Sequence, residues 1–127
     1  MIAADTSFLV DYLDGEPATL AFVEDHEPEP FAAPSYVLFE TYRGGLRSNG
    51  PDAVARIADA LDWIEPLPTT ETAVREAVAV ERELRAAGEP VNLGDVIIAG
   101  VCRDAGACLV TRDEDFERVS DLEVLSY

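Results

Sequence analysis

Hydrophobic residues along the chain fall into two patterns: short apolar runs, and longer segments with helical spacing. The short runs predict four to five buried strands. These are Met1–Ala4, Phe31–Ala33, Glu65–Leu67, Ala107–Thr111 and Glu123–Ser126. The segments between them repeat apolar residues every three or four positions, which is typical of amphipathic helices. These are Ser7–Leu13, Pro17–His26, Tyr36–Leu46, Pro51–Ile64, Glu71–Ala87 and Leu93–Ala105.

The alternation of short apolar strands with helices favours an α/β fold in which helices cover both faces of a parallel sheet. The helix predicted for residues 93–105 is apolar on most sides, so we expect it to be buried. No repeat, low-complexity tract or linker interrupts the pattern, which indicates a single domain over residues 1–127. Ligands of such sheets bind beyond the carboxyl ends of the strands, and we expect the chemistry there.

The charge of the chain is strongly acidic, with 26 Asp and Glu against nine basic residues and a net charge of −17. All nine basic residues are Arg, and the chain has no Lys. Such an acidic, lysine-free composition resembles that of proteins from extreme halophiles. Concentrated salt shortens the Debye length to about 3 Å at ~1 M, which screens the self-repulsion of an acidic domain.

The same composition excludes several classes of function. A nucleic-acid interface built on a broad basic patch is excluded, as are enzymes that need an active-site Lys, such as P-loop NTPases.

The longest uncharged stretch is the ten residues Pro30–Phe39, too short to span a membrane. The N-terminus lacks the basic start of a signal peptide. Cys102 and Cys108 form no CxxC motif, so we expect free thiols and a cytoplasmic protein.

Four acids occupy positions that favour a shared site. Asp5 follows the first strand, Asp113 follows the fourth, Asp95 lies in the first turn of the buried helix, and Glu40 lies on an apolar helix face. Each also has a simpler interpretation. Asp5 and Asp113 are common helix N-caps, and Asp95 suits a helix N-terminus. Glu40 could instead pair with Arg43 in solvent.

A divalent cation would explain why these acids gather. Neighbouring carboxylates repel one another and raise each other's pKa until a metal neutralises them. Oxygen ligands suit Mg²⁺ or Mn²⁺ rather than Zn²⁺. Zinc is further disfavoured because the only His, His26, lies in an acidic turn where we expect it to be solvated.

Four sequence motifs, in order along the chain, carry these acids. They are Ile2-Ala3-Ala4-Asp5-Thr6-Ser7, Val37-Leu38-Phe39-Glu40-Thr41-Tyr42-Arg43-Gly44, Asn92-Leu93-Gly94-Asp95-Val96-Ile97-Ile98-Ala99 and Leu109-Val110-Thr111-Arg112-Asp113-Glu114-Asp115-Phe116. With them the chain resembles the PIN-domain family, and within it the VapC-type toxins of type II toxin–antitoxin pairs. The resemblance implies a three-layer α/β/α fold with a short central parallel sheet of four to five strands.

The resemblance also implies an endoribonuclease that depends on Mg²⁺ or Mn²⁺ and hydrolyses RNA phosphodiester bonds with a metal-activated water. The catalytic acids would be Asp5, Glu40, Asp95 and Asp113. The metal ligands would be Asp5, Asp95 and Asp113 together with Asp115, which competes with Asp113 for the fourth position. Thr6 and Thr111 would supply hydroxyls that orient the carboxylates. Gly94 stands where many relatives have another residue.

Contacts to the RNA phosphates and to partner proteins complete the expectations. Arg43, Arg47 and Arg112 are near the acids in sequence and are expected to contact phosphates, although Arg43 could equally form a helix ion pair. The family resemblance implies a homodimer and a cognate antitoxin. The exposed part of the stripe Phe8, Leu9, Tyr12 and Leu13 is the expected docking groove, with core packing as the simpler explanation. The alternative function is a PIN-fold binding module that is not catalytic, or only weakly so, and acts through its partner.

The charge pattern predicts that stability depends on salt. We expect the folded state to weaken below about 0.5 M salt, where screening no longer reaches within ~4 Å. Thermal melts followed by circular dichroism between 0.1 and 3 M KCl, at fixed pH, should give a melting temperature that rises with salt. A melting temperature that does not change with salt would contradict adaptation to high salt.

Overall fold

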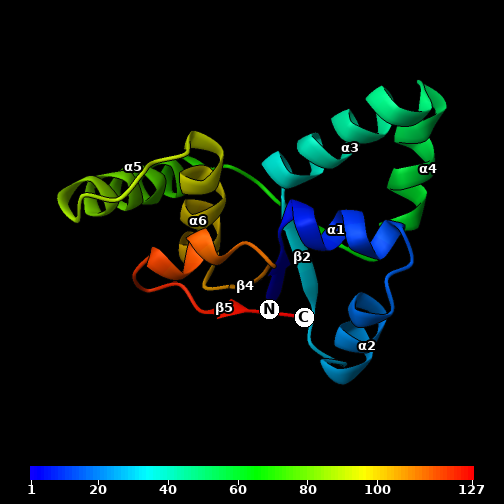
Figure 1. The fold of residues 1–127 in the computed structure, drawn as a ribbon, viewed down its shortest axis with the longest axis horizontal. Helices are drawn as coiled ribbons and strands as arrows, with labels where there is room; N and C mark the ends of the chain where they lie inside the picture. The colour runs from blue at the N-terminus through cyan, green and yellow to red at the C-terminus, as the bar shows by residue number, and fades with distance from the viewer.

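Five short parallel strands form one sheet in the computed structural model, which describes residues 1–127 (Figure 1). The strand order is β3-β2-β1-β4-β5. Their bounds are β1 Ile2–Ala4, β2 Phe31–Pro34, β3 Glu65–Leu67, β4 Cys108–Val110 and β5 Val124–Leu125. The three-layer α/β/α fold expected from the sequence is thereby confirmed, with a sheet at the upper end of the expected strand count.

Six α-helices and one 3₁₀ helix connect the strands. They are α1 Thr6–Leu13, α2 Pro17–Asp25, α3 Ser35–Asn49, α4 Asp52–Ala60, α5 Glu71–Ala86, α6 Leu93–Ala105 and the 3₁₀ helix η1 Glu114–Arg118. The chain moves in one direction across the sheet from β1 to β3, and in the other direction from β3 to β5. Right-handed crossovers therefore place α1–α4 on one face and α5 and α6 on the other. Figure 1 shows α5 and α6 together on one side of the sheet and α1 and α2 on the other.

The centre of the sheet is built from small residues. Ala3, Ala4, Ala32 and Ala33 are fully buried, so helices can approach the strands closely. Larger side chains fill the layers on either side, with Phe8 of α1 fully buried. Strands built from small residues pack between large side chains of the helices and form one continuous core. This core fixes where each strand ends.

Two helix ends differ from the expectations. The helix α4 ends at Ala60 rather than Ile64, although Leu61 and Ile64 remain buried in the following turn. The helix α3 passes through Gly44-Gly45 and ends at Asn49. A methyl group at Gly45 would lie 2.3 Å from Ile57 Cδ1, so this glycine allows α3 and α4 to pack closely and does not end the helix.

A second glycine controls the packing of α5 against α6. A methyl group at Gly100 would lie 2.5 Å from the Ala77 nitrogen and 2.7 Å from its Cα. Backbone atoms cannot move aside as a flexible side chain can, so only glycine permits this helix crossing. None of the helices is both long and apolar enough to cross a membrane.

The substitution Gly100→Ala should therefore destabilise the protein, by about 1–3 kcal/mol, because it forces α5 away from α6. Gly44→Ala is the matched control, since a methyl group at that helical position meets no atom within 4 Å. It should stabilise the protein by about 0.5–1 kcal/mol through helix propensity. Urea unfolding of both variants in molar salt measures the difference. Equal effects of the two substitutions would contradict this description of the helix crossing.

Candidate functional site

Asp5 and Thr111 lie side by side because they follow two adjacent parallel strands. In the sheet register Ala4 pairs with Val110, so the next residue of each chain segment emerges at the same edge. The Thr111 hydroxyl donates to Asp5 Oδ2 at 2.7 Å, and both residues are buried. Here β1 and β4 lead to helices on opposite faces of the sheet, the point at which open α/β sheets form a crevice.

The Thr111 hydroxyl also positions Asp113, whose backbone nitrogen donates to it at 3.0 Å. Asp113 Oδ1 then accepts from the Asp115 nitrogen at 2.9 Å and caps η1. The capping interpretation therefore holds for Asp113, but not for Asp5, whose side chain makes no cap contact to α1. The Thr111 hydroxyl thus orients the buried Asp5 carboxylate and also fixes the turn that carries Asp113 and Asp115.

Asp95 joins these acids from α6. Its position in the first turn is set by Asn92, whose side-chain oxygen accepts from the Asp95 nitrogen at 3.2 Å. Carboxylate oxygens of Asp95, Asp113 and Asp115 all lie within 4.8 Å of one another. Three carboxylates at this spacing form a donor set that suits Mg²⁺ or Mn²⁺. Asp113 and Asp115, the two alternatives for the fourth acid, both belong to this group.

Glu40 reaches the site from α3. Its Oε1 accepts from the Thr6 hydroxyl at 2.8 Å, and no ion pair with Arg43 forms. Asp5 and Glu40 are not part of the three-carboxylate group, but their charges act on it. The structure thus brings all five sequence-predicted acids, and both threonines, to one edge of the sheet.

The pKa values of the Asp5 and Asp95 carboxyl groups are raised at this site. Burial raises the pKa of Asp5, a rise that the Thr111 hydrogen bond opposes and the charges of Glu40 and Asp113 increase. Burial also raises the pKa of Asp95 to about 6. The charges of the other four acids add to this rise, with Asp113 and Asp5 contributing the most. A bound cation would relieve this repulsion.

Gly94 precedes Asp95 and has a clear steric role. A methyl group at this position would lie 2.9 Å from the Tyr36 hydroxyl oxygen and 3.1 Å from its Cε1. The glycine therefore lets the start of α3 lie against the start of α6. This contact brings the helix that carries Glu40 close to the helix that carries Asp95.

The three arginines expected to contact phosphates have different surroundings. Arg43 and Arg47 are exposed on α3 and form no ion pair. Arg112 Nη1 instead pairs with Asp11 Oδ2 at 3.0 Å, while 63% of its side chain stays exposed.

His26 is less solvated than expected, since its ring stacks on Phe22 with centroids 3.9 Å apart.

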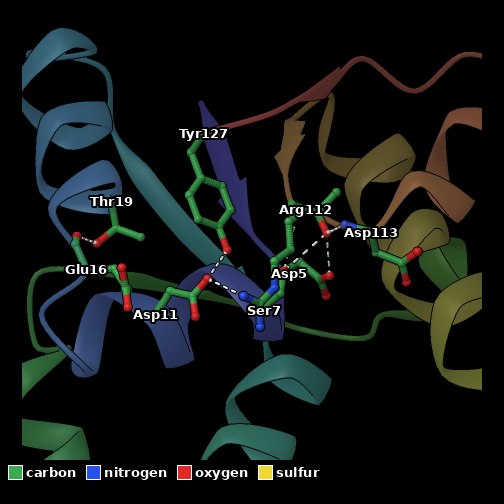
Figure 2. Close-up of polar contacts among 9 residues, drawn as sticks. Asp5, Ser7, Asp11, Glu16, Thr19, Arg112, Asp113 and Tyr127 are labelled. Carbon is green, nitrogen blue, oxygen red and sulfur yellow. Dashed lines mark hydrogen bonds and ion pairs between the residues drawn. The ribbon is translucent and has the colours of Figure 1, made fainter.

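Three further residues at this edge were missed by the sequence analysis: Ser7, Asp11 and Tyr127. Ser7 Oγ lies 3.3 Å from the Thr111 hydroxyl and accepts from the Arg112 nitrogen at 3.4 Å. Asp11 accepts from the Tyr127 hydroxyl at 2.6 Å (Figure 2). Ser7 and Asp11 are four residues apart on one helix, a spacing that places them on one face. No sequence pattern links either to Tyr127.

A groove lined by both apolar and polar residues leads away from Glu40. It has a volume of about 570 Å³ and lies between α1, α3 and α4. Its wall includes Val10, Leu13 and Ile57, and Glu40 is part of its lining. Of the stripe expected to form a docking groove, Phe8 and Leu9 are fully buried in the core. Leu13 alone of the four lines the groove, where Val10 joins it.

Comparison with known proteins agrees with this fold. The family model described as PIN domain matches residues 2–122. The chain is 30% identical over 138 aligned positions to VapC ribonuclease Mb1587 of Mycobacterium bovis, covering 100% of this chain and 99% of that protein. Ribonuclease VapC11 of Mycobacterium tuberculosis matches with the same identity and coverage.

Solved structures share the fold. The structure of VapBC2 from Rickettsia felis, bound to a DNA fragment from its promoter, matches with a TM-score of 0.90 and 22% identity, covering 100% of this chain and 99% of that one. Mycobacterium tuberculosis VapC20, described as a sarcin–ricin loop cleaving toxin, matches with a TM-score of 0.69 and 20% identity, covering 97% and 99%.

The chain therefore belongs to the PIN-domain family. Its curated relatives, which it matches over nearly their whole length, are VapC proteins within that family.

The raised pKa of Asp95 predicts a pH-dependent stability in the absence of divalent ions. Between pH 6 and 3.8 the folded protein holds a proton on Asp95 that the unfolded chain releases. Ionised Asp95 therefore destabilises the fold at neutral pH, and this cost shrinks as the pH falls from about 6 towards 3.8. Asp95→Asn should raise the free energy of unfolding at pH 7.5 in EDTA.

The gain from Asp95→Asn should shrink as the pH is lowered to 4.5. Urea titrations of wild type and variant at several pH values, at constant molar salt, measure the gain. A gain that is the same at all pH values, or a loss of stability at pH 7.5, would contradict the raised pKa.

Proposed function

We propose that this protein is a divalent-metal-dependent endoribonuclease and the toxin of a toxin–antitoxin pair. The observation that supports this most strongly is the convergence of five acids, from four separate segments of the chain, at the carboxyl edge of the sheet. Such a cluster costs stability in the absence of a cation, since burial and the neighbouring acids raise the pKa of Asp5 and of Asp95. The VapC relatives, which are ribonucleases by name, support the choice of RNA as substrate.

The metal would be Mg²⁺ or Mn²⁺, held by Asp95, Asp113 and Asp115 with Asp5 beside them. When bound, the ion would supply an activated water for attack on a phosphodiester and would neutralise charge on the phosphate oxygens. Thr111 keeps the Asp5 carboxylate oriented, and Thr6 does the same for Glu40. No His or Lys base is needed, which suits a chain without Lys.

Binding of an RNA strand to so acidic a protein needs local positive charge. The cation would provide part of it. Arg43 and Arg47 project from α3 without ion-pair partners, and Arg112 is next to Asp113. We assign these three arginines to phosphate contacts.

The groove between α1, α3 and α4 is the proposed docking site for an antitoxin segment. An amphipathic helix would place its apolar face against side chains such as Val10, Leu13 and Ile57. Because Glu40 lines the same groove, a bound segment would lie against the acidic site and block it. We further propose that the toxin is a homodimer, works in the cytoplasm and comes from a cell with concentrated internal salt.

The ribonuclease activity is tested with purified protein in molar KCl and Mn²⁺, using a fluorescent single-stranded RNA. Asp5→Asn should lower kcat/KM by more than about a hundredfold, because metal-assisted stabilisation of the reacting phosphate is worth several kcal/mol. EDTA should abolish cleavage by the wild type.

The matched control is Asp25→Asn, which removes the same charge from an exposed position on α2. It should cleave RNA as the wild type does. Residual cleavage that is equal in wild type and Asp5→Asn would point to a contaminating nuclease and would favour the non-catalytic binding module.

A further inference from the structure

One nitrogen of the Arg112 guanidinium forms an ion pair with the protein, and the other two are free. Its Nη1 pairs with Asp11 Oδ2 at 3.0 Å, while Nε and Nη2 form no hydrogen bond with the protein. With 63% of the side chain exposed, these nitrogens face solvent. A guanidinium carries five N–H donors in a planar fork that matches the oxygens of a phosphate. Arg112 therefore has free N–H donors that can bind a ligand.

The anchor of Arg112 is unusual in this chain, because Asp11 is buried at 8% exposure whereas most of the 26 acids lie on the surface. A buried carboxylate is costly unless it is paired and hydrogen-bonded. Asp11 Oδ2 meets this need by accepting from the Tyr127 hydroxyl at 2.6 Å as well as pairing with Arg112. One carboxylate oxygen thus joins the tyrosine to the arginine (Figure 2).

Tyr127 is itself held in place. Its ring packs edge to face on the fully buried Phe8, with centroids 5.0 Å apart. Burial and the hydrogen bond to Asp11 raise the pKa of Tyr127 to about 12, so its hydroxyl remains a donor at any working pH. Because the hydroxyl fixes the rotation of the Asp11 carboxylate, it also fixes the position of the guanidinium.

The backbone of Arg112 is attached to the same helix face. Ser7 Oγ accepts from the Arg112 nitrogen and contacts the Thr111 hydroxyl, which holds Asp5. Figure 2 shows Arg112 between Asp11 on one side and Asp5 with Asp113 on the other. The arginine is therefore set at a defined place beside the acids.

Arg112 differs in this respect from the other arginines. Arg75, Arg85, Arg103 and Arg118 pair with glutamates of α5 or of the residues that follow it, while Arg43 and Arg47 are exposed without an anchor. Only Arg112 combines a buried anchor with free donors next to the acidic edge.

We infer that Tyr127 and Asp11 are positioning residues that hold the Arg112 guanidinium beside the acidic site to receive a phosphate of the RNA strand. This inference rests on the proposed ribonuclease function. Arg112 binds the strand in the ground state and the transition state alike, so its loss weakens substrate binding and leaves the chemical step intact.

A double-mutant cycle tests the inference. Arg112→Ala should raise KM for a single-stranded RNA about tenfold with little change in kcat, as expected for one charge-assisted contact. Tyr127→Phe keeps the ring and the net charge, and should raise KM about threefold through loss of one hydrogen bond. In the Arg112→Ala background, Tyr127→Phe should have no further effect.

Controls separate this effect from charge and from general stability. Arg85→Ala changes the net charge as Arg112→Ala does, and Tyr42→Phe removes a tyrosine hydroxyl elsewhere; both should leave KM unchanged. If Tyr127→Phe fails to fold, Asp11→Asn replaces it and is compared with Asp25→Asn. Both remove one negative charge, but only Asp11→Asn should raise KM.

A second measurement does not depend on RNA cleavage. The ¹⁵N relaxation of the Arg112 Nε should show an ordered side chain in the wild type and a mobile one in Tyr127→Phe, with Arg47, which has no ion-pair partner, mobile in both. Equal mobility of Arg112 and Arg47 in the wild type would overturn the inference, as would additive effects of Tyr127→Phe and Arg112→Ala on KM. Ordered Arg112 in a protein that neither binds nor cleaves RNA would overturn the proposed function instead.

Discussion

Repulsion among carboxylates at the carboxyl edge of β1 and β4 governs both the stability of this fold and the placement of its few positive charges. Asp5 is almost fully buried, and Asp95 is charged close to Asp113 and Asp115, so each raises the free energy of the metal-free fold. The Thr111 hydroxyl, which serves both Asp5 and Asp113, offsets part of this cost. The remainder is tolerated because the alanine-rich strands and the close α5–α6 packing hold the edge in place.

The distribution of positive charge follows from the same constraint. With nine arginines against 26 acids, most guanidinium groups are used in ion pairs, four of them involving α5 or the segment after it. Exposed pairs of this kind contribute little stability, and salt weakens them further. Cations available to an RNA strand are therefore few, and their placement matters more than their number. Anchoring through Asp11 and Tyr127 gives Arg112 that placement without adding net positive charge to the surface.

Much of the fold could be predicted, because apolar runs and helical spacing are local signals. The shared edge of Asp5 and Asp113 could be predicted because each follows a strand, and the carboxyl ends of parallel strands lie at one edge of the sheet. The end of α3 lies at Asn49 rather than at the predicted Leu46. The packing role of Gly45 could not be predicted, because it is set by Ile57, a residue in a different helix. The Asp11–Tyr127 contact spans 116 residues and depends on where β5 leaves the sheet, which no local pattern encodes.

Binding of a hard divalent cation by these acids can be measured by isothermal titration of Mn²⁺ into the metal-free protein at pH 6.5, in two buffers of different ionisation enthalpy. We expect saturable binding that releases protons as the Asp95 carboxyl gives up its proton. This binding should be lost in Asp95→Asn but kept in Asp25→Asn. No saturable binding by the wild type, or equal binding by Asp95→Asn, would contradict this expectation.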